Sequence, residues 1–122
     1  MRRPITRLAA FTDPNLLGHF FAPLDTWQAH IVVIKALDGL ALNRYEGRLF
    51  RKLTGRRYRR TLADALLMIL LLWGRRSGKS CLTAFLALYE AYFVDHSRYL
   101  KPGETGMVQI VATDRRQAAI IL

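Results

Sequence analysis

An unbroken run of seven apolar residues near the middle of the chain, residues 66–72, constrains the fold more than any other feature. A run of this length is typical of a strand that is covered on both faces in a parallel sheet, although a buried helix has the same pattern. The longer stretch 62–73 contains Asp64 and is only 12 residues long, whereas crossing a bilayer takes about 20 apolar residues. The sequence therefore predicts a buried core element and no membrane-spanning segment.

The residues after this run favour the strand. A polar turn at residues 74–78 is followed by residues 79–96, which have the pattern of a well-packed helix. A second apolar segment, residues 107–112, is rich in β-branched residues and is predicted to be a strand, and Thr113 and Asp114 are suited to cap a helix after it. The order strand, turn, helix, strand, helix predicts the opening βαβ unit of an α/β domain.

Residues 1–60 are predicted to be helical or irregular. A threonine, an aspartate and a proline at residues 12–14 have the pattern of a helix start, and apolar residues follow at helical spacing as far as Phe21. A second helix is predicted over residues 25–39 and a third over residues 45–53. The N-terminal half is thus expected to be a helical segment that precedes the sheet.

The chain is strongly basic, with 19 Lys and Arg against 9 Asp and Glu and a net charge of +10. Residues 48–60 contain seven of these bases and no acid. Such a segment is either a solvated loop or a surface that binds phosphate groups through guanidinium contacts. The candidate DNA-binding residues are the four arginines at its end: Arg56, Arg57, Arg59 and Arg60.

Gly78, Lys79 and Ser80 match the second half of the phosphate-loop pattern G-x-x-x-x-G-K-[ST]. The first glycine of that pattern is replaced by Trp73, and the nearest glycine is Gly74, one place later. Backbone N–H groups ahead of the lysine would still surround an anion at the start of a helix. The alternative is an ordinary turn between strand and helix whose lysine is merely solvated.

The loop of residues 74–80, Gly-Arg-Arg-Ser-Gly-Lys-Ser, resembles the deviant Walker A loop of the large terminase subunit of tailed bacteriophages. Members of that family are ATPase-nucleases that package DNA. Residues 11–28, with the aromatic-glutamine pair Trp27 and Gln28, are similar to the stretch that precedes the ATPase core of these proteins. Residues 102–118 are similar to the segment that follows their Walker A helix. The resemblance covers nearly the whole chain.

The resemblance implies that an N-terminal helical segment with a basic loop, residues 1–60, lies on the adenine side. Residues 61–122 would begin a P-loop ATPase domain of the additional-strand, RecA-like class. The implied cofactors are ATP and Mg²⁺. The implied partners are double-stranded DNA, the small terminase subunit and the portal protein, in the cytoplasm of a bacterial host and without a membrane.

Site roles also follow from the resemblance. Lys79 and Ser80 would bind the ATP phosphates and Mg²⁺, with Ser80 as the metal ligand. Arg75 would be a cis arginine finger, with Arg76 as the runner-up. Trp27 and Gln28 would lie near the adenine, although a tryptophan at helical spacing also suits a core. The complete implied nucleotide site is Gly74, Arg75, Arg76, Ser77, Gly78, Lys79, Ser80, Trp27 and Gln28.

The family's Walker B aspartate, catalytic glutamate and nuclease carboxylates are not readable in this sequence. We therefore expect the N-terminal part of a longer protein, truncated before Walker B and unable alone to turn over ATP or cut DNA. One alternative is a small basic DNA-binding protein in which Gly78-Lys79-Ser80 is incidental and residues 48–60 form the working surface. A P-loop kinase or GTPase is less favoured, because those loops retain the first glycine.

Overall fold

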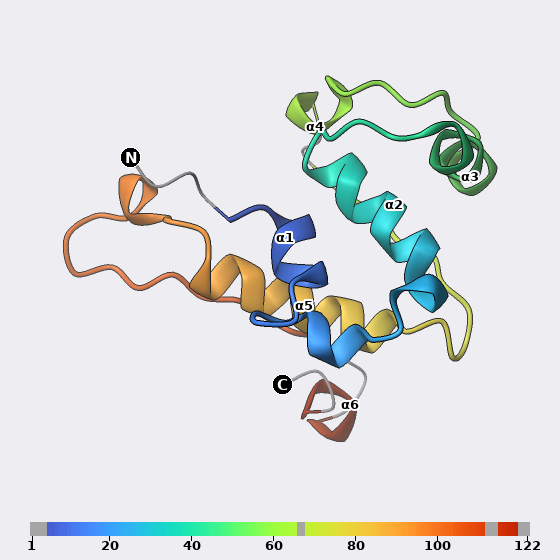
Figure 1. Ribbon diagram of the computed structural model, residues 1–122. Coiled ribbons are helices and arrows are strands. Elements are labelled where there is room, and N and C mark those ends of the chain that lie inside the picture. Colours follow the sequence, from blue (N-terminus) through green and yellow to red (C-terminus); the bar gives the residue numbers. More distant parts are fainter. Residues whose placement is uncertain (1–4, 66–67, 112–114, 120–122) are drawn as a thin grey trace. The chain divides into compact units, whose positions relative to one another are not determined.

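The computed structural model forms two compact units, which are described separately below. One unit spans Thr6–Leu72, and the other comprises Met1–Ile5 with Trp73–Leu122. The structure describes residues 5–65, 68–111 and 115–119. All regular secondary structure in these ranges is helical (Figure 1). The division predicted from the sequence, between residues 60 and 61, stays a prediction.

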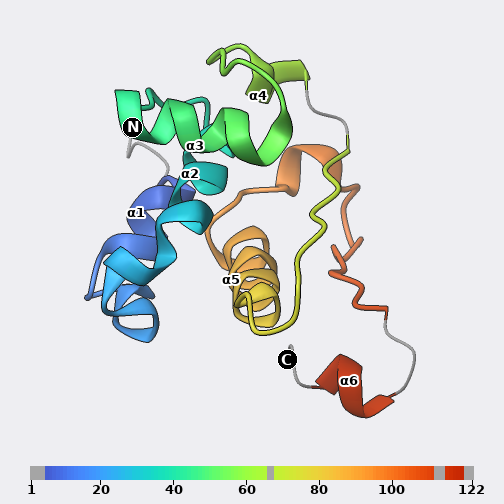
Figure 2. The same ribbon diagram turned by 90° about the vertical axis from the view of Figure 1, so that its right-hand side faces the viewer.

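The unit Thr6–Leu72 is built around one central helix, α2. Its elements in chain order are α1 (Arg7–Thr12), the 3₁₀ turns η1 (Gly18–Phe21) and η2 (Leu24–Trp27), α2 (Gln28–Leu37), α3 (Arg44–Thr54) and α4 (Leu62–Ala65). Helix α2 contacts α1, η2, α3 and α4. Figures 1 and 2 together show that α3 crosses α2 and does not run parallel to it.

Helix α1 is capped from two places in the sequence. The Thr6 hydroxyl accepts a hydrogen bond from Ala9 N at 3.1 Å. Asp38, the residue that ends α2, accepts from Leu8 N at 3.1 Å and from Arg7 Nη1 at 2.9 Å. A helix of six residues is not stable in isolation, since each free end leaves backbone groups unpaired. Helix α1 therefore depends on the end of α2.

The helix start predicted at residues 12–14 is wrong: α1 ends there. Thr12 is the last helical residue, and its hydroxyl donates back to Leu8 O at 2.8 Å. The Asp13 carbonyl then accepts from Leu16 N and Gly18 N in a tight turn. Proline at the next position suits a turn as well as a helix start, because both tolerate its missing N–H and fixed φ.

Aromatic rings fill the space beside α1. Phe11 and Phe21 stack with ring centroids 4.1 Å apart, and both are buried. The Trp27 indole meets them edge-on, at 6.0 Å from Phe11 and 5.0 Å from Phe21. Helix α1 is thus held by large apolar contacts as well as by its caps.

A second cluster holds α3 against α2. Its buried members are Val32, Ala36 and Phe50. Partly buried side chains surround them: Leu42, Leu49, Tyr58 and Leu62. The Tyr58 ring meets Phe50 edge-on at 5.1 Å, and its hydroxyl donates to Leu40 O at 2.6 Å. The loop after α3 is therefore attached to the same core as the helix.

Helix α3 extends one residue beyond each end of the helix predicted over residues 45–53. Asn43 and Glu46 form a capping box, in which each side chain accepts from the other residue's backbone N–H. Gly55 ends the helix in the left-handed conformation, with φ of 72°. The helices predicted over residues 25–39 and 45–53 are both confirmed, the first as η2 followed by α2.

The second unit contains α5 (Lys79–Tyr92), the 3₁₀ turn η3 (Ser97–Tyr99) and α6 (Arg115–Ala119). Helix α5 confirms the predicted helix but stops at Tyr92, four residues before the predicted end. Its buried residues Leu82, Phe85 and Tyr89 lie on one face. The Tyr89 hydroxyl donates to Ile5 O at 2.6 Å. The predicted caps Thr113 and Asp114 lie outside the described residues.

The predicted α/β fold is wrong. Residues 68–72 and 107–111, the described parts of the two predicted strands, pair with nothing as strands, so the described chain contains no βαβ unit. Met68, Leu70 and Leu72 are each about four-fifths exposed, at 86%, 78% and 83%. A strand needs neighbours for its backbone hydrogen bonds and helices over its faces, and apolar composition alone supplies neither.

No helix within the described residues is both long and apolar enough to cross a bilayer.

Candidate anion-binding sites

The loop before α5 adopts a conformation that most residues avoid. Arg76 has φ of 58° and is the one non-glycine residue with positive φ in the described part of the chain. Gly78 follows with φ of 74°, and its carbonyl accepts from Leu82 N at 3.0 Å as the first bond of α5. The Ser77 hydroxyl donates to Gly74 O at 2.8 Å across the turn. Backbone strain of this kind is concentrated at functional sites.

This conformation suits an anion. Successive backbone N–H groups beside left-handed residues form a concavity that binds phosphate. Helix α5 begins directly after it, at Lys79, with Gly78 at the N-cap and no side-chain cap. The first N–H groups of a helix need partners, and the helix dipole favours negative charge there. Phosphate binding by this segment stays a prediction.

The cationic side chains of the loop project into solvent. Arg75, Arg76 and Lys79 are exposed, and no carboxylate among the described residues lies within ion-pair distance of them. Ser80 is half-buried in the first turn of α5. The described residues contain no group of three or more His, Cys, Asp and Glu side chains that could hold a metal. Ser80 as a Mg²⁺ ligand stays a prediction.

Trp27 and Gln28 belong to the other unit, at the junction of η2 and α2. The Trp27 ring packs edge-on against Phe21 and also lies 4.5 Å from the His30 ring. These contacts agree with the alternative given in the sequence analysis, in which Trp27 packs in the core. The adenine contact of Trp27 and Gln28 stays a prediction.

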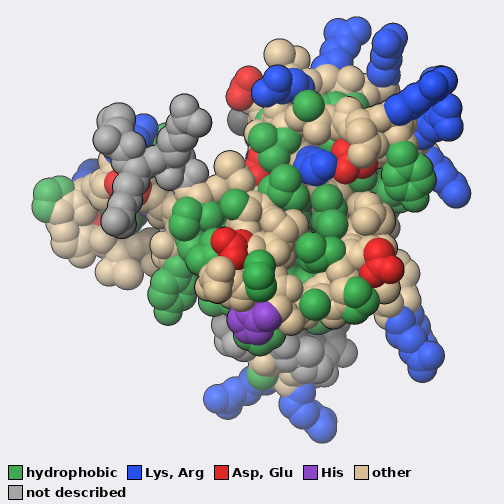
Figure 3. Space-filling model, viewed as in Figure 1, with side chains coloured by type: hydrophobic (Ala, Val, Ile, Leu, Met, Phe, Trp, Pro, Cys, Tyr) green, Lys and Arg blue, Asp and Glu red, His purple; other side chains and the backbone are tan. Residues whose placement is uncertain are grey.

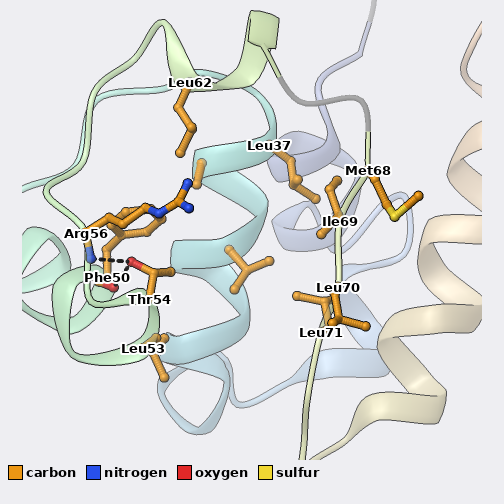
Figure 4. A pocket seen from close by; sticks show the side chains of 12 residues that line it. Leu37, Phe50, Leu53, Thr54, Arg56, Leu62, Met68, Ile69, Leu70 and Leu71 are labelled. Atoms are coloured by element: carbon orange, nitrogen blue, oxygen red, sulfur yellow. Dashed lines mark hydrogen bonds between the residues drawn. The ribbon is translucent and has the colours of Figure 1, made fainter.

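The four arginines assigned to DNA have different surroundings, and their assignment to DNA stays a prediction. Arg60 Nε donates to Gly39 O at 3.0 Å, and Arg59 is exposed at a turn. Arg56 lines an apolar pocket of about 430 Å³ between α2, α3 and residues 68–71, where it lies beside Phe50 (Figure 4). Arg57 faces a different hollow. The sequence showed that these residues are close along the chain, but not where their side chains point.

That hollow, named here the α3 hollow, has a volume of about 480 Å³ and is lined mainly by arginine. Its lining residues are Leu42, Arg44, Gly47, Arg48, Arg51, Arg57 and Tyr58. Figure 3 shows Lys and Arg side chains gathered over α3 and the residues that follow it. Arg44 is not among the residues expected from the sequence, because Glu46 separates it from the basic run. The signal that could have found it is the helical spacing of 44, 48 and 51.

Comparison with known proteins adds no relative: no family model, no curated protein and no solved structure matches this chain.

Proposed function

We propose that residues 74–80 bind the phosphate groups of ATP, in a cytoplasmic DNA-packaging protein of the terminase type. The observation that carries the proposal is the placement of Gly78, Lys79 and Ser80. The left-handed Arg76 and Gly78 precede an uncapped helix that begins at the motif's lysine. The resemblance of this loop and its flanking segments to terminases supplies the biological context, including double-stranded DNA, the small subunit and the portal as partners.

Each loop residue has a separate task in this proposal. The backbone N–H groups of the turn and the first turn of α5 hold phosphate oxygens. The Lys79 ammonium neutralises them, and the Ser80 hydroxyl ligates the Mg²⁺ that accompanies the nucleotide. Arg75, with Arg76 as the alternative, lies in the same loop and stabilises charge on the terminal phosphate. The bound nucleotide supplies the phosphoryl group; these residues position it.

Titration of the purified chain with Mg·ATP by calorimetry tests the proposal. Lys79→Ala should weaken binding by roughly 10-fold to 100-fold, since a charge-assisted contact contributes about 1.5–3 kcal/mol. The matched control is Lys101→Ala, because Lys101 is an exposed lysine of the same unit outside the loop. Helix content by circular dichroism confirms that each variant is folded.

A second variant separates the metal from the phosphates. Ser80→Ala should weaken binding of Mg·ATP and leave binding of ATP without Mg²⁺ nearly unchanged. Equal binding by the wild-type chain and Lys79→Ala would contradict the proposal, as would an equal loss in Lys101→Ala.

A further inference from the structure

The α3 hollow contains Arg48, Arg51 and Arg57, three bases of the segment 48–60 for which the sequence left phosphate contact and a solvated loop as alternatives. Arg44, Arg48 and Arg51 are spaced at i, i+4 and i+7 along α3, so they project from one side of the helix. Gly47 lies between them, and a Cβ built on it would meet nothing within 4 Å. Arg57 lines the same hollow from the loop after the helix. Four arginines therefore line the same open space.

This arrangement does not serve the stability of α3. Like charges at i, i+3 and i, i+4 destabilise a helix, and a cation in the first turn, such as Arg44, opposes the helix dipole. No carboxylate within the described residues is in ion-pair range of the four arginines. The one acid of α3, Glu46, is buried and already bound by Lys35 and by Asn43 N. The positive charge of the hollow is left for an external anion.

We propose that the α3 hollow binds the phosphodiester backbone of duplex DNA, without reading its sequence. Arg44 and Arg51 are seven residues apart, which is about 10 Å along the helix axis. Each nucleotide of a DNA strand carries one negative phosphate, so a row of arginines on one side of a helix is complementary to the strand in charge. Guanidinium groups bind phosphate oxygens in bidentate fashion. The row therefore matches a DNA backbone in charge.

The other lining residues favour a duplex over single strands. Binding of single strands uses aromatic side chains on which bases stack. Tyr58 is the aromatic residue that lines the hollow, and its contacts within the chain leave it unable to stack on a base. Its hydroxyl donates to Leu40 O, and its ring packs against Phe50. The apolar lining is limited to Leu42 and Tyr58, whereas protein partners dock through larger apolar anchors. The ligand that fits the hollow is therefore the backbone of a DNA duplex, bound independently of its sequence.

The inference is independent of the nucleotide loop, and fluorescence anisotropy with a labelled random-sequence 20-base-pair duplex tests it without nucleotide. Binding is measured over a series of salt concentrations. Each lost phosphate contact lowers the slope of log K against log salt by about 1. The triple variant Arg44→Ala, Arg48→Ala, Arg51→Ala should lower the slope by about 2–3 and weaken binding at least 10-fold at low salt. A slope equal to that of the wild-type chain would overturn the assignment.

A matched pair at Gly47 tests the hollow itself without removing any arginine. Gly47→Glu places a carboxylate among the four guanidinium groups and should weaken DNA binding at least 10-fold. Gly47→Ala should leave it unchanged, because its methyl group enters open space. Equal binding by the two variants would overturn the inference.

Three controls establish the site and the ligand. Arg98 is an exposed arginine of the other unit, so Arg98→Ala should change the slope by no more than about 1. Lys79→Ala should keep full DNA affinity even where nucleotide binding is lost, which separates this inference from the proposed function. Polyglutamate of equal charge should bind at least 10-fold more weakly than the duplex. Equal affinity for polyglutamate would reassign the hollow to acidic polypeptides.

Discussion

The Lys35 Nζ atom lies 2.6 Å from Glu46 Oε1, and this ion pair joins α2 to α3. The Glu46 side chain is only 7% exposed. Its second oxygen accepts from Asn43 N at 2.9 Å, which closes the capping box at the start of α3. One carboxylate therefore caps α3 and attaches it to α2. Because Glu46 faces α2, the arginines on the other side of the helix face outward.

Replacing this carboxylate should weaken the fold. Glu46→Gln keeps the shape of the side chain but leaves the partly buried Lys35 ammonium without its counter-charge. We expect a loss of about 2–3 kcal/mol in the free energy of unfolding, measured with urea. Asp25→Asn is the control, since Asp25 is exposed, and it should change stability by less than about 0.5 kcal/mol. An equal effect of both variants would contradict the structural role of Glu46.

The same carboxylate should make stability depend on pH. Burial tends to raise its pKa, but the hydrogen bonds from Lys35 and Asn43 N outweigh burial, and the pKa lies below the ordinary value of 4.5. A carboxyl whose pKa is lower in the folded chain contributes its full stability above the unfolded pKa and loses it as pH falls through the folded pKa. Urea unfolding of the wild-type chain should weaken below about pH 4.5 more steeply than that of Glu46→Gln. Parallel pH profiles would refute this assignment.

Gly18 should tolerate no side chain. A Cβ at this position would lie 2.6 Å from the carbonyl carbon and oxygen of Thr12 and 2.7 Å from Asp13 O. These are backbone atoms of the turn that ends α1, so relief requires the turn to move. Gly18→Ala should lower the unfolding free energy by about 1–3 kcal/mol, seen as a lower Tm. An unchanged Tm would mean that the turn relaxes freely.

Gly47 should behave in the opposite way. It lies inside α3, where glycine is costly because of its backbone freedom, and its Cβ position is open. Gly47→Ala should therefore stabilise the chain by about 0.5–1 kcal/mol, measured by urea unfolding. Destabilisation would show that the hollow is filled in the folded chain.

The elements that the sequence predicted correctly are those with local signals. Helix α3 has a capping residue, an acid three positions later and a glycine after its last turn, and all three act within the helix itself. The start of α5 at Lys79 also has a local signal, a glycine at the N-cap position, Gly78. Such contacts join residues a few positions apart, so the sequence alone contains them.

The strand predictions failed because their evidence was not local. Residues 66–72 carry apolar side chains suited to a covered strand, but forming one depends on other segments that pair with it. Within the described part, alternate side chains differ: Ile69 and Leu71 are 49% and 38% exposed, between the more exposed Met68, Leu70 and Leu72. Two of the apolar side chains are thus partly covered, although the described residues of this segment pair with no strand.

The two candidate sites, the loop before α5 and the α3 hollow, also differ in how far the sequence could predict them. The motif before α5 could be read from adjacent residues. The α3 hollow could not, because it brings Arg57 beside arginines of the preceding helix and excludes Arg56, its immediate neighbour in sequence. The core contacts of Tyr58 decide where the side chains of the loop after α3 point. Counting the charged residues in the sequence does not reveal these contacts.

The bond between Asp38 and the first turn of α1 also bears on the order of events during synthesis. Residues 7–12 leave the ribosome about thirty positions before the aspartate that caps them, and at 5–20 residues per second this gap lasts a few seconds. During that interval the nascent segment has only Thr6 to hold its first turn. Helix α1 is therefore fully capped only after α2 has been synthesised.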